Sequence, residues 1–203
     1  MGIIKFCTIL IFLVFIFRCT SPQNTEAIYE IDESKSLVFW RGYAKGGYHE
    51  GTIGIHGENV TVSDGRLISG TFLFPLLSLT NTDLPTNEER QQLVRQLQGP
   101  DFFYMVLYPE IKFEINKVED YLNAQDSHSN YLVSGELTVL GNSRPVSFPA
   151  SMSVENNSLK AEGKLVLDFT DWGMTYARDT TRSDRRHVKP NIDLIVKIYA
   201  SQL

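Results

Sequence analysis

Cysteine is nearly absent from this sequence of 203 residues, because only Cys7 and Cys19 occur and both lie near the N-terminus. The chain after Cys19 therefore forms no disulfide, and a packed core has to supply its stability. Histidine is also sparse, and the four histidines are scattered, at His49, His56, His128 and His187. No two of them have the spacing of metal ligands, so we expect no metal site.

Sequence signatures of an enzyme are missing as well. The chain contains no Gly-x-Ser-x-Gly, no His-Glu-x-x-His, no phosphate-binding glycine loop and no dinucleotide-binding fingerprint. Asp168 and Asp171 are three positions apart, and on a strand this spacing sends the two carboxylates to opposite faces. We therefore expect a protein that does not catalyse a reaction.

An excess of basic residues is the third feature that the sequence lacks. Its 19 Lys and Arg residues against 24 Asp and Glu residues give a formal charge of -5. Removal of residues 1–18 would take away Lys5 and Arg18, leave 17 basic residues and change the formal charge to -7. Long-range attraction to phosphate needs the opposite sign, so we expect no nucleic-acid partner.

The N-terminus has the pattern of a targeting segment. Lys5 precedes a mostly apolar run from Phe6 to Phe17, which has the length of a signal peptide. This run is shorter than the roughly 20 apolar residues that a membrane-spanning helix needs. We assign residues 1–18 to a signal peptide and the polar residues 19–27 to a flexible tether.

Cys19 directly follows this segment, and the pattern resembles a bacterial lipoprotein signal, in which the cysteine becomes the lipid-modified first residue of the mature chain. An acylated Cys19 would attach the protein to a membrane of the cell envelope through its acyl chains. Arg18 stands where that signal normally has a small residue. Ordinary secretion and an uncleaved anchor are the alternatives.

From residue 28 onward, short segments of alternating apolar and polar residues are separated by turn residues. This pattern is typical of an all-β antiparallel fold, and one apolar face per strand favours a single closed or nearly closed sheet. We expect one domain over residues 28–203, with strands at 29–31, 37–40, 60–62, 67–74, 111–115, 131–139, 146–154, 159–169 and 192–200. Asp64-Gly65 predicts a hairpin between two of them.

One helix is predicted among the strands, over residues 86–98. Thr86 and Glu89 have the spacing of a capping box, and Gly99-Pro100 ends the segment. A narrow apolar stripe indicates that this helix lies on the sheet or across its mouth. The following residues, 99–115, form an aromatic turn and then a strand, and such a turn can plug the end of a barrel or line an apolar cavity.

Several motifs occur in order along the chain: Tyr29-Glu30-Ile31-Asp32, Gly46-Gly47-Tyr48-His49-Glu50-Gly51, Asp101-Phe102-Phe103, Tyr108-Pro109-Glu110-Ile111-Lys112-Phe113, Val133-Ser134-Gly135-Glu136-Leu137-Thr138-Val139, the segment 141–149 and Asp171-Trp172-Gly173-Met174. In these motifs, which cover about residues 28–200, the sequence resembles the YceI-like, polyisoprenoid-binding family. The resemblance implies a single extended, lipocalin-like antiparallel β-barrel with one short helix. It also implies a long isoprenoid or fatty chain in an elongated interior channel.

The resemblance thus implies non-catalytic binding of a long-chain apolar lipid, of isoprenoid, quinone, fatty-acid or fatty-amide type, in the bacterial cell envelope or periplasm. It implies no cofactor besides such a lipid, and family members often form homodimers. The side chains that alternation directs inward, and that would line the channel, are Phe39, Phe72, Phe102, Phe103, Phe113, Leu137, Phe148, Met152, Leu165, Leu167, Leu194 and Val196. The alternative is that these side chains fill the core, as they do in small barrels.

Two further features have two interpretations each. Arg182, Arg185 and Arg186, in a basic cluster that reaches Lys189, are candidates to hold a phosphate or carboxylate head group, or they form a solvated loop. Trp172 either anchors a turn at the end of the barrel or contacts the ligand. If the barrel is packed, the alternative function is that of a lipid-anchored interaction or structural module of the envelope.

Overall fold

The computed structural model describes residues 26–44, 46–123, 125–126, 128–174, 176 and 188–203. The strands are β1 (Glu26–Ile31), β2 (Leu37–Ala44), β3 (Gly47–Gly54), β4 (His56–Gly57), β5 (Val60–Ser63), β6 (Arg66–Ser69), β7 (Thr71–Pro75), β8 (Glu110–Asp120), β9 (Tyr131–Val139), β10 (Asn142–Glu155), β11 (Ser158–Asp168) and β12 (Val188–Gln202). The helices are η1 (Leu76–Ser78), α1 (Asn87–Gln98) and η2 (Phe169–Trp172). Neither α1 nor the 3-10 helices of this part of the chain could serve as a transmembrane span.

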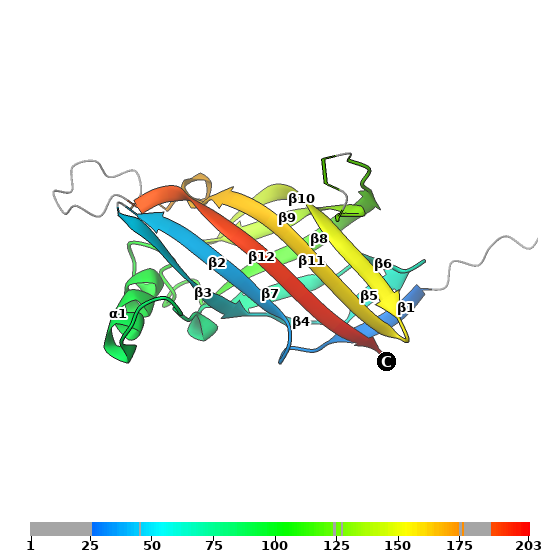
Figure 1. The fold of residues 1–203 in the computed structure, drawn as a ribbon, viewed down its shortest axis with the longest axis horizontal. Coiled ribbons are helices and arrows are strands. Elements are labelled where there is room, and N and C mark those ends of the chain that lie inside the picture. Colours follow the sequence, from blue (N-terminus) through cyan, green and yellow to red (C-terminus); the bar gives the residue numbers. More distant parts are fainter. Residues whose placement is uncertain (1–25, 45, 124, 127, 175, 177–187) are drawn as a thin grey trace, which may run out of the picture.

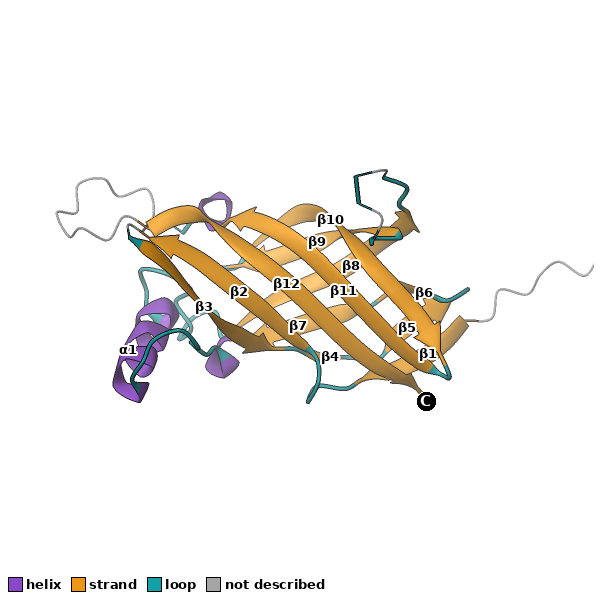
Figure 2. Ribbon diagram, in the orientation of Figure 1, coloured by secondary structure: helices purple, strands orange, loops and turns teal. Residues whose placement is uncertain are grey.

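The strands join in one antiparallel sheet that curls around a long axis (Figure 1). Its main order is β4-β7-β8-β9-β10-β11-β12-β1-β5-β6, and β2 and β3 branch from it at β12. The 15-residue strand β12 pairs with β11 along one edge. Along its other edge, its first part pairs with β2 and its last part with β1. The predicted all-β, antiparallel, lipocalin-like fold with one helix is confirmed (Figure 2).

Backbone hydrogen bonds outside the ladders bring the edges of the curled sheet together. The segment that follows β7 runs along β3, where the N–H of Thr80 donates to the carbonyl oxygen of Thr52 at 2.8 Å. The N–H of Thr82 donates to the carbonyl oxygen of Glu50 at 2.9 Å. These bonds satisfy backbone groups of β3 that would otherwise form an open strand edge.

The predicted hairpin and helix are both present. Asp64 and Gly65 have φ angles of 50° and 76°, the positive values of a type I′ turn, and they connect β5 to β6. In α1, the Thr86 side chain accepts from the N–H of Glu89, and the Glu89 side chain accepts from the N–H of Thr86. This reciprocal capping box fixes the start of the helix at the predicted position.

The single strand predicted over residues 67–74 is wrong, because the chain bends at Gly70. Strand β6 pairs with β5, whereas β7 pairs with β8 and β4. A Cβ at Gly70 would lie 2.8 Å from Cγ1 of Val60, so a side chain at the bend would be crowded. The carbonyl oxygen of Gly70 accepts from the N–H of Ile115 at 3.0 Å, which ties the bend to β8.

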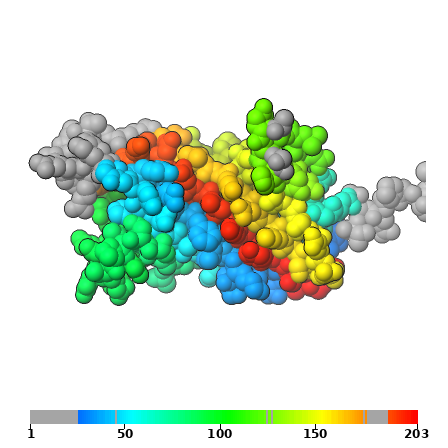
Figure 3. All heavy atoms as spheres, viewed as in Figure 1, coloured from blue at the N-terminus to red at the C-terminus, as the bar shows by residue number. Residues whose placement is uncertain are grey.

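Side chains at one end of the barrel pack tightly together, and we call this the closed end. Its buried members include Tyr29, Val60, Val62, Leu159 and Ala200, each at most 4% exposed. They come from β1, β5, β11 and β12. The opposite end holds α1, the hairpin turn between β2 and β3, and the start of β12 (Figures 1 and 3).

Candidate functional site

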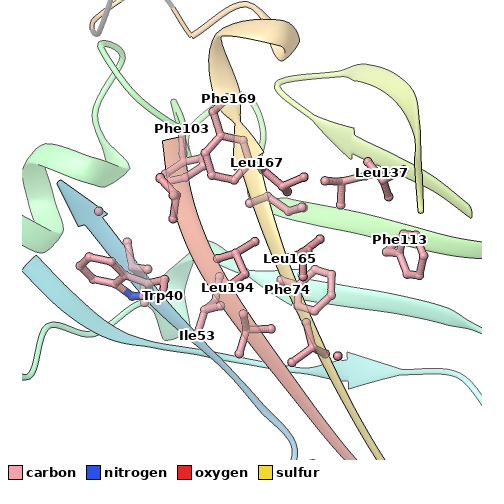
Figure 4. A pocket seen from close by; sticks show the side chains of 18 of the residues that line it. Trp40, Ile53, Phe74, Phe103, Phe113, Leu137, Leu165, Leu167, Phe169 and Leu194 are labelled. Atoms are coloured by element: carbon pink, nitrogen blue, oxygen red, sulfur yellow. The ribbon is translucent and has the colours of Figure 1, made fainter. Parts of the chain in front are cut away.

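A cavity of about 360 Å³ occupies the barrel between α1 and the closed end. Its lining comes from β2, β3, β6 to β12, α1 and the 3-10 helices. Figure 4 shows labelled side chains of β2, β3, β7, β8, β9, β11 and β12 around this interior space. A volume of this size falls in the range of small-molecule pockets. The interior of the barrel is therefore partly hollow.

Most of the predicted channel residues lie in the cavity wall. They are Phe72, Phe102, Phe103, Phe113, Leu137, Phe148, Met152, Leu165, Leu167, Leu194 and Val196. The lining also contains apolar residues that were not predicted, including Trp40, Ile53, Phe74, Phe169 and Met174. The cavity wall is thus made mainly of aromatic and aliphatic carbon.

The prediction that Phe39 faces inward is wrong. Its side chain is 39% exposed, outside the cavity lining, and Nζ of Lys197 lies 5.4 Å from its ring centroid. Its neighbours Val38 and Trp40 line the cavity instead. Because Val38, Phe39 and Trp40 are all apolar, the alternation of β2 gave no indication of which of them faces inward.

Two glycines make room for aromatic rings deep in the cavity. A Cβ at Gly135 would lie 2.7 Å from the Phe113 ring, and one at Gly163 would lie 2.6 Å from the Phe148 ring. The two rings are 5.8 Å apart between centroids and are tilted by 47°. Each ring thus lies against the backbone of a neighbouring strand, where a side chain in place of glycine would collide with it.

Aromatic side chains also pack between the turn after α1 and η2. Phe103 meets Phe169 edge to face, with centroids 5.4 Å apart, and Phe169 meets Trp172 at 6.0 Å. Trp172 is 4% exposed, and its Nε1 donates to the carbonyl oxygen of Leu137 at 2.8 Å. Trp172 is not part of the cavity lining, so it anchors the turn.

Several polar residues border the cavity at the end near α1. We call the part lined by Tyr43, His49, Gln96 and Lys189 the mouth. The hydroxyl of Tyr43 donates to Oδ2 of Asp193 at 2.5 Å, and this bond raises the pKa of Tyr43 above its ordinary value. Lys189 places its Nζ 5.7 Å from the centroid of the Tyr43 ring.

His49 is held in the mouth by Asp83. Its Nδ1 lies 2.8 Å from Oδ2 of Asp83, whose Oδ1 accepts from the N–H of Glu50 at 2.9 Å. Burial by itself would raise the pKa of Asp83. The bonds from the Glu50 N–H, His49 and Asn81 outweigh burial and hold that pKa below its usual range. Asp83 therefore stays a carboxylate that orients the imidazole.

One polar atom of the cavity wall has no partner within the described residues. It is Nε1 of Trp40, which is buried without a hydrogen bond. An unpaired buried donor lowers the free energy of unfolding by about 1–3 kcal/mol.

Several predicted sites lie outside the described residues, namely Cys19 and the head-group candidates Arg182, Arg185 and Arg186. Their roles stay predictions. Within the described part of the chain, no three His, Cys, Asp or Glu side chains gather as metal ligands. Asp168, one of the two carboxylates considered for catalysis, instead accepts the N–H of Thr170 at 2.9 Å and caps η2.

An antiparallel barrel around an apolar cavity defines the lipocalin-like class of folds. A family profile described as a YceI-like domain matches residues 29–200. The chain therefore belongs to the YceI-like family, as its motifs predicted.

Solved structures share this fold at low sequence identity. BcnA of Burkholderia cenocepacia is 16% identical, with a TM-score of 0.61 over 85% of this chain and 100% of that chain. A polyisoprenoid-binding domain from Saccharophagus degradans, implicated in plant cell wall breakdown, is 12% identical, with a TM-score of 0.60 over 88% of this chain and 100% of its own. A Campylobacter jejuni YceI protein is 17% identical, with a TM-score of 0.51 over 68% and 74%. Among curated proteins, none is significantly similar in sequence.

Proposed function

We propose that this protein binds a long-chain apolar lipid inside its barrel and performs no catalysis. The lipid is of isoprenoid, quinone, fatty-acid or fatty-amide type. The observation that carries the proposal is the cavity of about 360 Å³, whose wall is almost entirely apolar between the mouth and the closed end. The description of the Saccharophagus degradans relative as polyisoprenoid-binding supports the same ligand class.

The energetics of an apolar wall suit a chain lipid. Burial of one methylene contributes about 0.8 kcal/mol, so ten buried methylenes contribute about 8 kcal/mol before ordering costs. An affinity of this kind needs no constellation of catalytic polar groups. What it needs is a dry, elongated space. Phe113, Phe148 and Leu165 are among the apolar residues that border the cavity.

The protein acts in the bacterial cell envelope in this proposal. The signal-like segment 1–18 directs export, and acylation of Cys19 attaches the barrel to a membrane. The support is the sequence pattern of Lys5, the apolar run 6–17 and Cys19. Mass spectrometry of the protein from cell envelopes tests this step, because an acylated N-terminal Cys19 has the mass of the mature chain plus its acyl groups.

The alternative function is that of an interaction module of the envelope that binds no ligand. It requires a barrel whose interior is filled by its own side chains. Mass spectrometry of an organic extract of the purified, tag-free protein separates the two functions. Prenyl or acyl chains that co-purify support lipid binding. A clean extract, together with no binding of added quinones or fatty amides, favours the module.

A pair of variants on β11 tests the cavity directly. Leu165 lines the cavity, whereas the next residue, Val166, points outward and is 60% exposed. Leu165→Trp places an indole in the cavity, and we expect it to weaken lipid binding at least about tenfold because the chain loses its space. Val166→Trp is the matched control and should keep the affinity of the unmodified protein, measured by displacement of a fluorescent fatty probe. Equal affinities in both variants would contradict binding inside the barrel.

A further inference from the structure

Apolar side chains are exposed on two neighbouring segments at the end of the barrel that holds α1. Leu77 is 81% exposed on η1, and Val106 and Leu107 are 84% and 59% exposed in the turn between α1 and β8. Tyr104 of the same turn is 36% exposed. We call these four side chains the exposed cluster. Apolar side chains that gather on a surface mark a place of contact.

Hydrogen bonds hold the two segments together. The N–H of Leu76 donates to the carbonyl oxygen of Pro109 at 2.9 Å, and Nε2 of Gln98 donates to the carbonyl oxygen of Leu76 at 2.8 Å. Within the turn, the N–H of Leu107 donates to the carbonyl oxygen of Tyr104 at 3.0 Å. The exposed cluster is therefore presented by backbone whose hydrogen bonds are formed, in one bonded part of the chain.

The same two segments also supply side chains to the cavity wall. Leu76 of η1 and Phe102 and Phe103 of the turn are buried and line the cavity, whereas Leu77 and Val106 of the same segments are exposed. The exposed cluster is thus continuous along the chain with the cavity lining. A surface that contacts the cluster would lie next to the space in which the lipid is proposed to bind.

The chemistry of a chain lipid favours uptake by direct contact with a bilayer. Each methylene that leaves hydrocarbon for water lowers the equilibrium concentration of the lipid in water about fourfold. A lipid with ten or more methylenes therefore remains almost entirely in the bilayer. A protein that collects such a lipid gains from a surface that touches the bilayer beside its own cavity.

The size and charge of the exposed cluster fit a lipid surface. A stable protein interface uses about 20–30 residues on each side, many more than the cluster offers. A bilayer accepts a few apolar side chains, and tyrosine is favoured at the level of the head groups. Residues 75–79 and 99–110 contain no Lys or Arg but include Asp101 and Glu110, so an anionic surface would not attract them.

We propose that the exposed cluster docks this end of the barrel on the surface of a zwitterionic lipid bilayer. Leu77, Val106 and Leu107 insert below the head groups, and Tyr104 lies at their level. This inference rests on the proposed function and adds the surface through which the protein reaches its lipid. Contact at the cluster shortens the path of the lipid through water between bilayer and cavity.

Vesicle flotation tests this contact. The measurement uses the mature chain, residues 19–203, with Cys19→Ser, so that no acyl group attaches the protein to vesicles. We expect this chain to bind phosphatidylcholine vesicles. Val106→Ser combined with Leu107→Ser should weaken the binding at least tenfold, because two apolar side chains no longer insert. Leu77→Ser alone should weaken it at least threefold.

Leu122→Ser is the matched control. Leu122 is 98% exposed and follows β8, which begins beside the exposed cluster and runs to the other end of the barrel (Figure 1). Its replacement removes exposed apolar surface of the same kind and should leave vesicle binding within twofold. All of the substituted side chains are exposed, and the Tm of each variant verifies that it folds.

The rate of lipid uptake gives a second measurement. A fluorescent fatty probe is supplied either in phosphatidylcholine vesicles or dissolved in water. We expect Val106→Ser with Leu107→Ser to slow uptake from vesicles at least tenfold. The affinity for the dissolved probe should stay within twofold, because neither side chain belongs to the cavity lining.

The outcomes separate this inference from the proposed function. If the double variant binds vesicles and collects the probe as the unmodified chain does, the docking surface is wrong and lipid binding stands. The same holds if vesicle binding requires phosphatidylglycerol, or if the substitutions dissociate a dimer and leave vesicle binding intact. If no probe enters the protein from either source, the proposed function fails and this inference fails with it.

Discussion

At the scale of single residues, Gly51 shows how closely two chain segments approach. A Cβ at this position would lie 1.9 Å from the carbonyl oxygen of Thr80 and 2.9 Å from Cζ2 of Trp40. We expect Gly51→Ala to lower the free energy of unfolding by about 3 kcal/mol, because the Thr80 backbone has to move and its bond to β3 is strained. Denaturant unfolding measures this change.

The control for this prediction lies on the adjacent strand β2. A Cβ at Gly42 would meet nothing within 4 Å, so Gly42→Ala should change the free energy of unfolding by less than about 1 kcal/mol. A similar cost for both substitutions would show that the loss comes from glycine replacement in general. The packing of the Thr80 segment on β3 would then not be the cause.

The sequence predicts the direction of single side chains only where polar residues alternate with apolar ones. Leu165 and Leu167 line the cavity, as predicted. The prediction was possible because the polar residues Lys164 and Asp168 stand at alternate positions and identify the outer face of the strand. Phe39 stands between Val38 and Trp40, which are both apolar, so no polar neighbour identifies the outer face of its strand. The mouth was beyond prediction for another reason: Tyr43, His49 and Gln96 belong to separate elements, and only the tertiary fold brings them together. His49 belongs to the glycine-rich motif 46–51, but nothing in the spacing of that motif predicts that His49 borders the cavity.

At the scale of elements, α1 matters because it supplies Leu93, Gln96 and Leu97 to the cavity. Its stability depends on the capping box, since none of its residues is fully buried. We expect Thr86→Ala to cost about 1 kcal/mol, because the N–H of Glu89 loses its acceptor. Hydrogen exchange of the α1 amides measures the effect and should show faster exchange in the first turn.

The neighbouring position gives the control for the cap. Asn87 is exposed at the first position of the helix, and Asn87→Ala should leave exchange in α1 unchanged or slower, because alanine is the better helix former. Faster exchange in both variants would indicate that α1 is held by its C-terminal contacts rather than by its cap.

The ends of elements were predictable where a local interaction fixes them. Thr86, Glu89 and Gly99 define α1 through short-range bonds, and Asp64-Gly65 defines the hairpin of β5 and β6. The bend at Gly70 was not predictable, because it depends on β6 and β7 pairing with different strands. The hydrogen bonds between the Thr80 segment and β3 escaped prediction for the same reason: they join residues more than twenty positions apart.

At the scale of the whole molecule, ligand binding should stabilise the barrel. A lipid at 100 times its Kd adds about 2.7 kcal/mol to the free energy of unfolding. For a domain of this size, that corresponds to a rise in Tm of about 5–10 °C. Differential scanning fluorimetry with added lipid should show this rise for the unmodified protein and for Val166→Trp, and little or none for Leu165→Trp. A rise of the same size in Leu165→Trp would mean that the lipid stabilises another surface.

The place where the first strand begins determines how an acylated protein would stand on its membrane. Strand β1, which begins at Glu26, lies at the closed end of the barrel, away from α1 (Figure 1). Seven residues, 19–25, separate Cys19 from β1, and a fully extended chain of this length spans at most about 25 Å. The 15 residues of β12, which runs along the barrel, extend for about 50 Å. The tether is therefore shorter than the barrel. An upright barrel would then have its opening directed away from the bilayer that holds it. Such an orientation suits exchange of cargo with a facing membrane or a docking protein, rather than extraction from the lipids beneath it.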